Sequence, residues 1–250
     1  MTLHEMLRDG LVARLIAGDS GGISPFMFIL LCAVGAVIAY FLGGLNFAII
    51  ISKYKFKDDI RRYGSGNAGM TNMLRTYGKA AAAFTLVGDM AKAIVSVLIG
   101  TLLAGEGGAY IAALFCVIGH SFPIMYGFKG GKGIVVTASA LLVLEPVVFL
   151  ILFLIFVLLV ASTKFLSLGS IVGMLLYPLL LNRMYPILNG GISEGATVAI
   201  VSILNTILVV WLHRENIGRL MSGTENKFSL KKKDKFIKDE KKDTDDENKQ

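Results

Sequence analysis

Long apolar runs, separated by short polar segments, fill the chain from about residue 26 to residue 212. A membrane-spanning helix needs about 20 consecutive apolar residues, and most of these runs approach that length. We predict spans at residues 26–51, 80–103, 109–126, 134–144, 147–161, 166–181 and 195–212. The fourth run is short, and Glu145-Pro146 marks either a tight turn or a kink, which leaves five spans as the alternative. The predicted fold class is therefore an all-α integral membrane protein, a bundle of seven transmembrane helices of which some are short or broken.

Composition agrees with this class, since 54% of the 250 residues are hydrophobic and the mean hydropathy is +0.67. The net charge of +7 would suit a nucleic-acid partner, but the basic residues gather in alternate connections. They follow spans one, three, five and seven, as Lys53, Lys55, Lys57, Arg61, Arg62, Arg75 and Lys79, then Lys129 and Lys132, then Lys164, then Arg214, Arg219 and the tail. The opposite connections hold little beyond Arg183. Because basic loops stay in the cytoplasm, we predict the N-terminus outside, the C-terminus inside and no nucleic-acid partner.

The two ends of the chain differ from the part between them. Residues 1–24 form an amphipathic extension, with Leu7, Leu11, Leu15 and Ile16 on one side, that fits an interfacial helix. Residues 25–227 form the membrane-embedded domain. Residues 228–250 mix lysine with aspartate and glutamate, which predicts a disordered charged cytoplasmic tail.

Two patterns in this sequence carry little weight. His4 and Asp9 match the His-x4-Asp spacing of many acyltransferases, but one such pair often arises by chance, and the predicted topology puts it outside the cell. The cysteines Cys32 and Cys116 both fall inside predicted spans, which argues against a disulfide framework or a cysteine metal site. We predict no metal and no cofactor.

The loop after the first span carries a candidate phosphate site. Three glycines alternate there with Ser, Asn and Thr, and a helix is predicted from about Met70. Backbone N–H groups, hydroxyls and a helix N-terminus then converge on one spot, and an arginine one turn later can clamp an anion. The candidate residues are Ser65, Gly66, Asn67, Gly69, Thr71, Asn72 and Arg75.

A second candidate site follows the third span, where His120 and Ser121 precede Phe128–Gly133, which reads Phe-Lys-Gly-Gly-Lys-Gly. Lysine supplies a compact positive charge, and glycine lets a backbone N–H approach a ligand. A merely charged turn is the simpler interpretation. The order of Gly and Lys differs from a Walker A loop, which argues against nucleotide binding. The candidates are His120, Lys129, Gly130, Gly131, Lys132 and Gly133.

Other polar residues accompany these loops. Asp89 and Lys92 lie inside the second span, three residues apart, and either form an ion pair that fixes helix packing or belong to the site. Lys164 and Ser167 lie between spans five and six. After span seven, a helix would place His213, Arg214, Asn216 and Arg219 close together.

All of these loops fall on one face of the predicted bundle. The positive-inside tendency explains the cations there but not the accompanying Asn, Ser, His and Gly. We therefore predict a cytoplasmic pocket that binds one or more phosphates between apolar helices that can admit a lipid chain. An anion transporter and a noncatalytic head-group binder remain as alternatives, although no inverted repeat supports the transporter.

Three motifs carry a family resemblance: Gly64–Asn72, Gly119–Gly133 and His213–Leu220. In this order they resemble the motifs of the bacterial acyl-phosphate:glycerol-3-phosphate acyltransferases, the PlsY-type membrane enzymes. The resemblance covers residues 26–227. It implies a seven-helix enzyme of the bacterial plasma membrane, with a cytoplasmic active site and a functional link to an enzyme that forms acyl phosphate. The extension, the tail and Lys164, where arginine is expected, depart from the family pattern.

The implied reaction moves a fatty acyl group from acyl phosphate to the 1-hydroxyl of glycerol 3-phosphate, giving lysophosphatidate and phosphate. Acyl phosphate already has a good leaving group, so the site needs to orient two anions and stabilise the carbonyl oxygen rather than supply a nucleophile. The first loop would bind one phosphate and residues 129–133 the other. His120, His213 and Asn216 would orient the acceptor or the oxyanion, and the base is either a histidine or a substrate phosphate.

Overall fold

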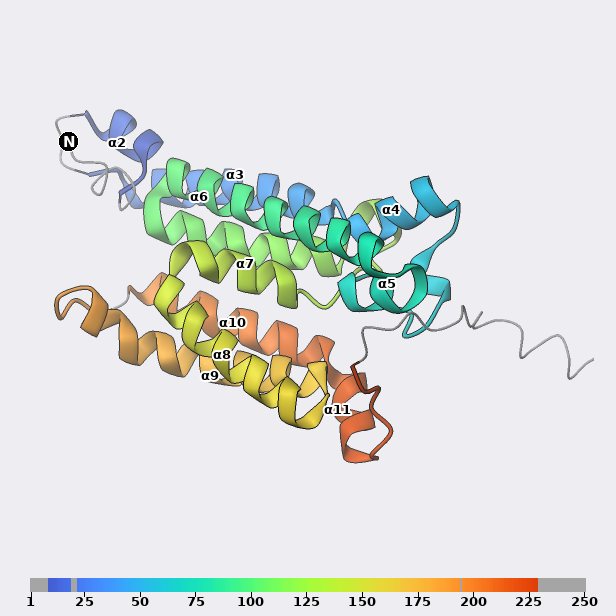
Figure 1. Cartoon of the computed structure of the whole chain (residues 1–250). Coiled ribbons are helices and arrows are strands. Elements are labelled where there is room, and N and C mark those ends of the chain that lie inside the picture. Colours follow the sequence, from blue (N-terminus) through green and yellow to red (C-terminus); the bar gives the residue numbers. More distant parts are fainter. Residues whose placement is uncertain (1–8, 19–21, 194, 229–250) are drawn as a thin grey trace, which may run out of the picture.

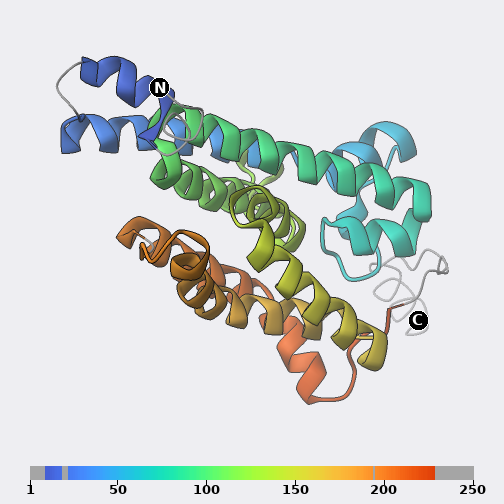
Figure 2. The same cartoon turned by 60° about the vertical axis from the view of Figure 1, so that its left-hand side comes forward.

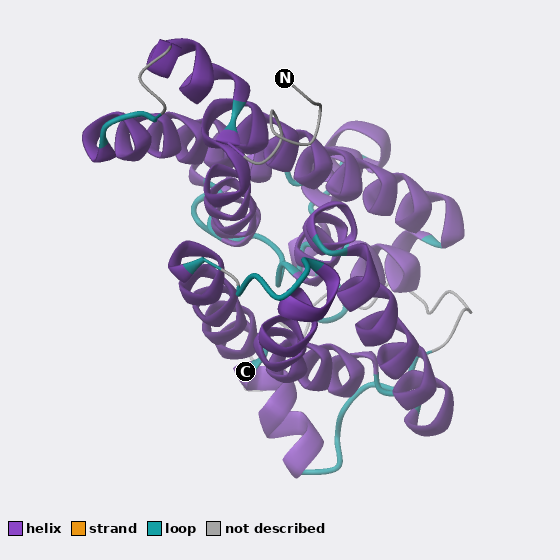
Figure 3. Cartoon of the chain, turned by 90° about the vertical axis from the view of Figure 1, so that its left-hand side faces the viewer, coloured by secondary structure: helices purple, strands orange, loops and turns teal. Residues whose placement is uncertain are grey.

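The computed structural model describes residues 9–18, 22–193 and 195–228, and within these ranges all regular secondary structure is helical (Figure 3). The elements are α2 Leu11–Ala17, α3 Pro25–Gly44, α4 Phe47–Phe56, η2 Ile60–Arg62, α5 Met70–Tyr77, α6 Lys79–Ser121, η3 Ile124–Tyr126, α7 Ile134–Leu144, α8 Pro146–Thr163, α9 Leu166–Leu188, α10 Ala196–Leu212 and α11 Arg214–Met221. The predictions for His4, Leu7 and the charged tail fall outside the described residues.

The helices form two groups, which are joined by α7 and by packing of α10 against α6. On one side α3 packs along α6, and on the other α8, α9 and α10 lie together, with α7 between them (Figures 1 and 2). Helices α4, α5 and α11 gather at one end of the bundle, which we call the motif end, and α2 lies at the other (Figure 1). Large apolar side chains such as Phe84 and Phe153 are exposed, as expected of a surface that faces lipid.

Helix α6 contains a reversal of direction. Ala104 and Gly105 depart from helical geometry, with φ at Gly105 of +63°, a conformation that glycine adopts without strain. The two arms then run back along each other and pack closely near the reversal. A Cβ atom on Gly100 would lie only 2.4 Å from the carbonyl oxygen of Gly108, so this position needs glycine. The separate predictions of spans at 80–103 and 109–126 correspond to these two arms.

The first predicted span, 26–51, is not one continuous helix, so this part of the prediction is wrong. The helix breaks at Leu45 and Asn46, and α4 starts afresh with the Asn46 side chain accepting from the N–H of Ile49 at 3.1 Å. The Asn46 amide also donates to the carbonyl of Ala68 at 3.1 Å, so the break ties the first span to the Gly64–Asn72 motif. A buried amide with both of these partners stabilises the break.

Among the described residues, four helical stretches are long and apolar enough to cross a membrane: Pro25–Phe56, Lys79–Tyr126, Pro146–Thr163 and Leu166–Leu188. The pair α10 and α11, bent by 57°, makes a fifth. The 11 residues of α7 span only about 16 Å, roughly half of the apolar core of a bilayer. Helix α7 ends at Leu144 and α8 begins at Pro146, so Glu145 lies between two separate helices.

The described part of the N-terminal extension contains helix α2, and its placement at the membrane interface stays a prediction. Ala13 of α2 is buried against Ala104 at the reversal of α6, whereas Leu15 is 74% exposed and Ile16 is 49% exposed. Asp9, the described half of the His-x4-Asp pattern, forms an ion pair with Arg14 at 2.5 Å.

Candidate active site

A cavity of about 500 Å³ lies between α5, α6, α7, α8, α9 and α11. Its polar lining comes from the connections and helix ends at the motif end and includes Arg75, His120, Lys132, His213 and Arg219. Its apolar lining comes from the body of α7, α8 and α9 and includes Leu141, Leu142, Phe149, Leu152, Phe153, Phe156, Met174 and Tyr177. The cavity thus has the polarity of an amphiphile with a charged head and an apolar tail.

Asn72 organises the first motif from within. Its buried amide donates to the carbonyls of Tyr63 at 2.9 Å and Asn67 at 3.1 Å, and its oxygen accepts from the N–H of Ser65 at 3.2 Å. The N–H of Gly66 donates to Tyr63, and that of Gly69 donates to Asn67. These groups were predicted to bind phosphate, but they are used to fold the loop, which leaves the Asn67 and Thr71 side chains on the cavity wall.

The glycines of the second motif also have another role than predicted. The N–H groups of Gly130 and Gly131 donate to the carbonyls of Ser121 and His120, at 3.0 and 3.1 Å. A Cβ atom would lie 1.9 Å from the His120 carbonyl oxygen at position 130, and 2.1 Å from the His120 Nε2 at position 131. Glycine is needed here for close approach to the protein itself, not to a ligand.

The two lysines of the second motif lie in different environments. Lys129 is exposed and does not line the cavity, and its carbonyl accepts from Arg61 at 3.1 Å. Lys132 lines the cavity, and its ammonium donates to the Asn216 side-chain oxygen. Burial and the nearby Arg219 lower the pKa of Lys132 to about 8.

The third motif is held by Glu225, a residue that the sequence analysis did not select. The buried Glu225 carboxylate accepts from Asn216 Nδ2 at 2.9 Å, Arg219 Nε at 2.8 Å and Ser167 Oγ at 2.9 Å. Burial opposes ionisation, but these donors lower the pKa of Glu225 overall. One carboxylate thus fixes side chains from α9 and α11 on the cavity wall.

Positive charge is in excess at the polar end. Arg75, Lys132 and Arg219 all line the cavity. The carboxylates near them are Glu225 and the exposed Glu215, while Asp89 is paired with Lys92. The Arg75 guanidinium makes no ion pair or hydrogen bond with any residue in the described part of the chain. Burial lowers its pKa, yet a guanidinium remains charged at neutral pH. This arrangement favours binding of a dianion such as a phosphate.

A buried cluster joins His120 to Asp89 and Lys92. The Lys92 ammonium lies 2.8 Å from Asp89 Oδ1 and 2.9 Å from His120 Nδ1, and also donates to the carbonyls of Gly43 and Leu45. An ammonium can only donate, so Nδ1 of His120 accepts and the ring proton lies on Nε2. Asp89 and His120 line the cavity while Lys92 lies behind them, so the cluster fixes helix packing and also orients a cavity side chain.

His213 has the opposite tautomer. Its Nδ1 lies 2.7 Å from the carbonyl oxygen of Val209, which can only accept, so the proton of the neutral ring lies on Nδ1. Nε2 is therefore left as a hydrogen-bond acceptor. His213 lines the cavity, so the two histidines provide one donor and one acceptor.

The structure brings together most of the residues predicted for the site. Those on the cavity wall are Ser65, Asn67, Gly69, Thr71, Asn72, Arg75, Asp89, His120, Lys132, Gly133, Ser167, His213, Asn216 and Arg219. Those away from it are Gly66, Lys92, Lys129, Gly130, Gly131, Lys164 and Arg214. Arg214 instead lies 4.3 Å from the ring of Trp211, at the surface. An acidic residue in a basic segment was the signal by which Glu225 could have been found.

Residues 33–223 match the family model described as glycerol-3-phosphate acyltransferase. The chain belongs to this family. A glycerol-3-phosphate acyltransferase of Thermoanaerobacter pseudethanolicus is 41% identical over 196 residues, which cover 78% of this chain and 95% of the relative. One of Clostridioides difficile is 41% identical over 207 residues, covering 79% and 95%.

Solved structures of the family are also similar. A crystal structure of PlsY, an integral membrane glycerol 3-phosphate acyltransferase, in its glycerol 3-phosphate form has a TM-score of 0.71 and 30% identity, covering 79% of this chain and 96% of that one. Its lysophosphatidic acid form has a TM-score of 0.68 and 29% identity, covering 80% and 96%. The prediction of an all-helical membrane protein of this family is confirmed.

Phosphate affinity should depend on the charge of Lys132. With a pKa of about 8, this lysine loses its proton as the pH rises through 8, so affinity is full below that pH and declines above it. We expect calorimetry to show roughly tenfold weaker binding of inorganic phosphate at about pH 9.5 than at about pH 7.5, where phosphate is already largely dianionic. Lys132→Arg should remove this dependence, and an equal decline in that variant would contradict the assignment.

Proposed function

We propose that this chain transfers a fatty acyl group from acyl phosphate to the 1-hydroxyl of sn-glycerol 3-phosphate, giving lysophosphatidic acid and phosphate, the first step of phospholipid biosynthesis. The observation that carries the proposal is the cavity that joins Arg75, Lys132 and Arg219 at one end to an apolar lining at the other. Family membership and the glycerol 3-phosphate and lysophosphatidic acid forms of the related PlsY support the choice of substrates.

The arrangement suits an acyl transfer that needs no protein nucleophile. Arg75, with the Asn67 and Thr71 side chains, holds one phosphate, and Lys132 with Arg219 holds the other. The hydroxyl oxygen bonds to the acyl carbon, the bond from that carbon to the phosphate oxygen breaks, and the hydroxyl proton ends on the released phosphate. Two fixed anions placed side by side lower the entropic cost of this step.

The histidines complete the site. His213 presents Nε2 as an acceptor, which orients the hydroxyl group of glycerol 3-phosphate and can carry its proton. His120 presents a proton on Nε2, held in that tautomer by Lys92, and stabilises the carbonyl oxygen as it gains charge. Asn216, fixed by Glu225, keeps the Lys132 ammonium in place.

We further propose seven membrane crossings, with the N-terminus outside, the C-terminus inside and the site facing the cytoplasm of a bacterial cell. The reversal at Gly105 supports this count because it divides α6 into two antiparallel arms. The basic residues of α4, α5 and α11 support the orientation, since these helices gather at the motif end (Figure 1). An enzyme that makes acyl phosphate would supply the donor.

Purified protein given palmitoyl phosphate and radiolabelled glycerol 3-phosphate should form lysophosphatidic acid. Arg75→Ala should lower turnover by at least about tenfold, because it removes a partly buried cation from one phosphate. Thin-layer separation of the labelled product measures both results. Uptake of glycerol 3-phosphate into vesicles with no product would instead indicate a transporter.

Glu225→Gln should lower kcat by about tenfold, because the neutral amide holds Asn216 and Arg219 less firmly. The matched control is Glu215→Gln, whose side chain is 69% exposed and 3.9 Å from Arg219, and whose kcat should stay within about twofold. Steady-state kinetics gives kcat for both variants. Equal losses would mean that the acidic charge of the region matters, not the contacts of Glu225.

The orientation can be tested by thiol labelling in a background with Cys32 and Cys116 changed to Ala. Cysteines placed at the exposed positions Phe128 and Glu215 should react with an impermeant maleimide only from the cytoplasm, and one at Asn189 only from outside. Intact and inverted vesicles provide the two sides. Labelling of positions 128 and 215 from opposite compartments would rule out the proposed active site.

A further inference from the structure

A second groove lies beside the active-site cavity, with a volume of about 570 Å³. One bank is formed by Met70 and Leu74 of α5 with Ala82, Ala83 and Leu86 of α6, and the other by Phe156, Val157, Val160 and Ala161 of α8. Lys79, Lys164, Leu166 and Phe228 complete the lining. The sequence pattern does not predict this groove, and the proposed acyl transfer makes no use of it.

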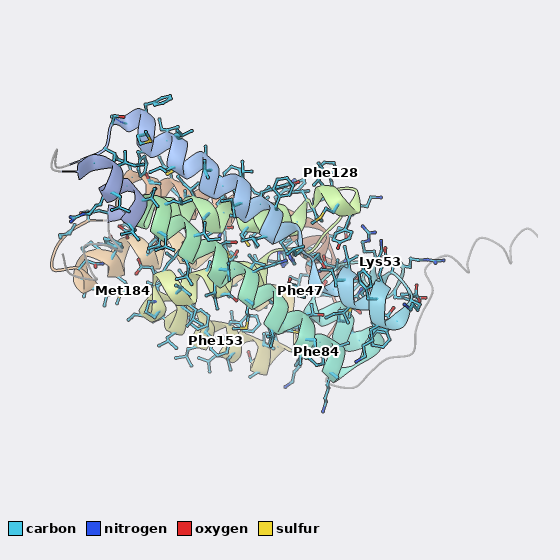
Figure 4. All side chains as sticks on the ribbon, turned by 90° about the horizontal axis from the view of Figure 1, so that it is seen from above. Phe47, Lys53, Phe84, Phe128, Phe153 and Met184 are labelled. Atoms are coloured by element: carbon cyan, nitrogen blue, oxygen red, sulfur yellow. The ribbon has the colours of Figure 1, made fainter. Side chains whose placement is uncertain are left out.

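The groove opens on a surface that faces lipid. Around it the apolar side chains of Phe84 and Val87 on α6 are 63% and 64% exposed, and those of Val157 and Leu158 on α8 are 42% and 60% exposed. Phe84 and Phe153 lie along the same edge of the bundle (Figure 4). Helices α6 and α8 are joined mainly through α7, so the two do not close the space between them.

Only a few side chains separate the groove from the active-site cavity. Met70, Leu86, Phe156 and Leu166 line both spaces. None of the four is fully buried, and methionine and leucine change rotamer readily. A shift of these side chains would join the groove to the apolar part of the cavity.

Two cations mark the cytoplasmic end of the groove. Lys79 begins α6, and Lys164 follows the last residue of α8. Both are exposed, and neither has an acidic partner among the described residues. Lysines at the end of an apolar surface that faces lipid extend their ammonium groups towards lipid head groups, where they attract phosphates. Lys164, which lies outside the active-site cavity, therefore lines this groove instead.

We propose that this groove is the lateral portal through which the acyl phosphate donor passes from the inner leaflet into the active site. The inference rests on the proposed acyl transfer. Lys79 and Lys164 receive the phosphate, the walls of α6 and α8 receive the chain, and the chain slides past Phe156 and Leu166 without crossing water. Because exposing an apolar chain to water is costly, this route favours donors that are dissolved in the bilayer.

Val157→Trp, which fills the groove, should test this route in vesicles of phosphatidylcholine. We expect kcat/KM for palmitoyl phosphate to fall by about tenfold or more, while kcat/KM for water-soluble butyryl phosphate changes by less than about twofold. The matched control is Leu154→Trp on the same helix, at a 59% exposed position that lines neither space. Equal losses with both donors, or no loss with palmitoyl phosphate, would overturn the proposal.

The lysines require a separate comparison. Lys79→Gln with Lys164→Gln should raise KM for palmitoyl phosphate by about tenfold and leave KM for glycerol 3-phosphate unchanged. Lys55→Gln with Lys57→Gln removes the same charge at the end of α4, away from the groove, and should have little effect. A similar rise in both double variants would show that only the general basic surface matters.

A binding measurement distinguishes failure of the portal from failure of the proposed function. A photoreactive hexadecyl phosphate should label Val157 and Ala83, and Val157→Trp should reduce labelling of Ala83. Labelling without lysophosphatidic acid formation would overturn the enzyme activity and retain the groove as a lipid phosphate site. Normal activity with no labelling of either bank would overturn the portal alone.

Discussion

A lysine inside an apolar helix is the constraint on which this structure depends. The Lys92 ammonium would be costly at that position unless its charge and its three donors were satisfied. It is satisfied by the Asp89 carboxylate, by His120 and by the carbonyls of Gly43 and Leu45. Those carbonyls are available because the first span breaks just before Asn46. One buried cation therefore fixes the break in the first span, the alignment of the two arms of α6 and the tautomer of His120.

Close backbone packing extends this order to the motifs. The loop that contains Gly130 and Gly131 can lie against His120 only because neither residue has a Cβ atom, and the N–H groups of both donate to the end of α6. Lys132 then reaches the cavity while Lys129 stays outside. Because these contacts are made within the protein itself, they hold the cations in place for an anion, which is the basis of electrostatic preorganisation.

The structure also has features suited to receiving a substrate from the membrane. The cavity couples a cationic head region to an apolar tail region, and the adjoining groove between α6 and α8 faces lipid. A donor with a long acyl chain and a phosphate matches both features. The water-soluble acceptor and the lipid-soluble donor thus have separate routes to one site, which suits a reaction between two anions of such different solubility.

The sequence by itself determined the class of protein, the single face on which the motifs meet and 14 of the cavity residues, because hydropathy, basic loops and motif composition are local properties. It also identified the start of α5 and the reversal near Gly105. Only the tertiary structure decided which donors are free. The Asn72 amide and the N–H groups of Gly130 and Gly131 form hydrogen bonds within the protein. Lys132 rather than Lys129 lines the cavity. The Glu225 carboxylate accepts hydrogen bonds from two side chains of α11. These facts depend on contacts between residues far apart in the chain, and no spacing along the sequence records them.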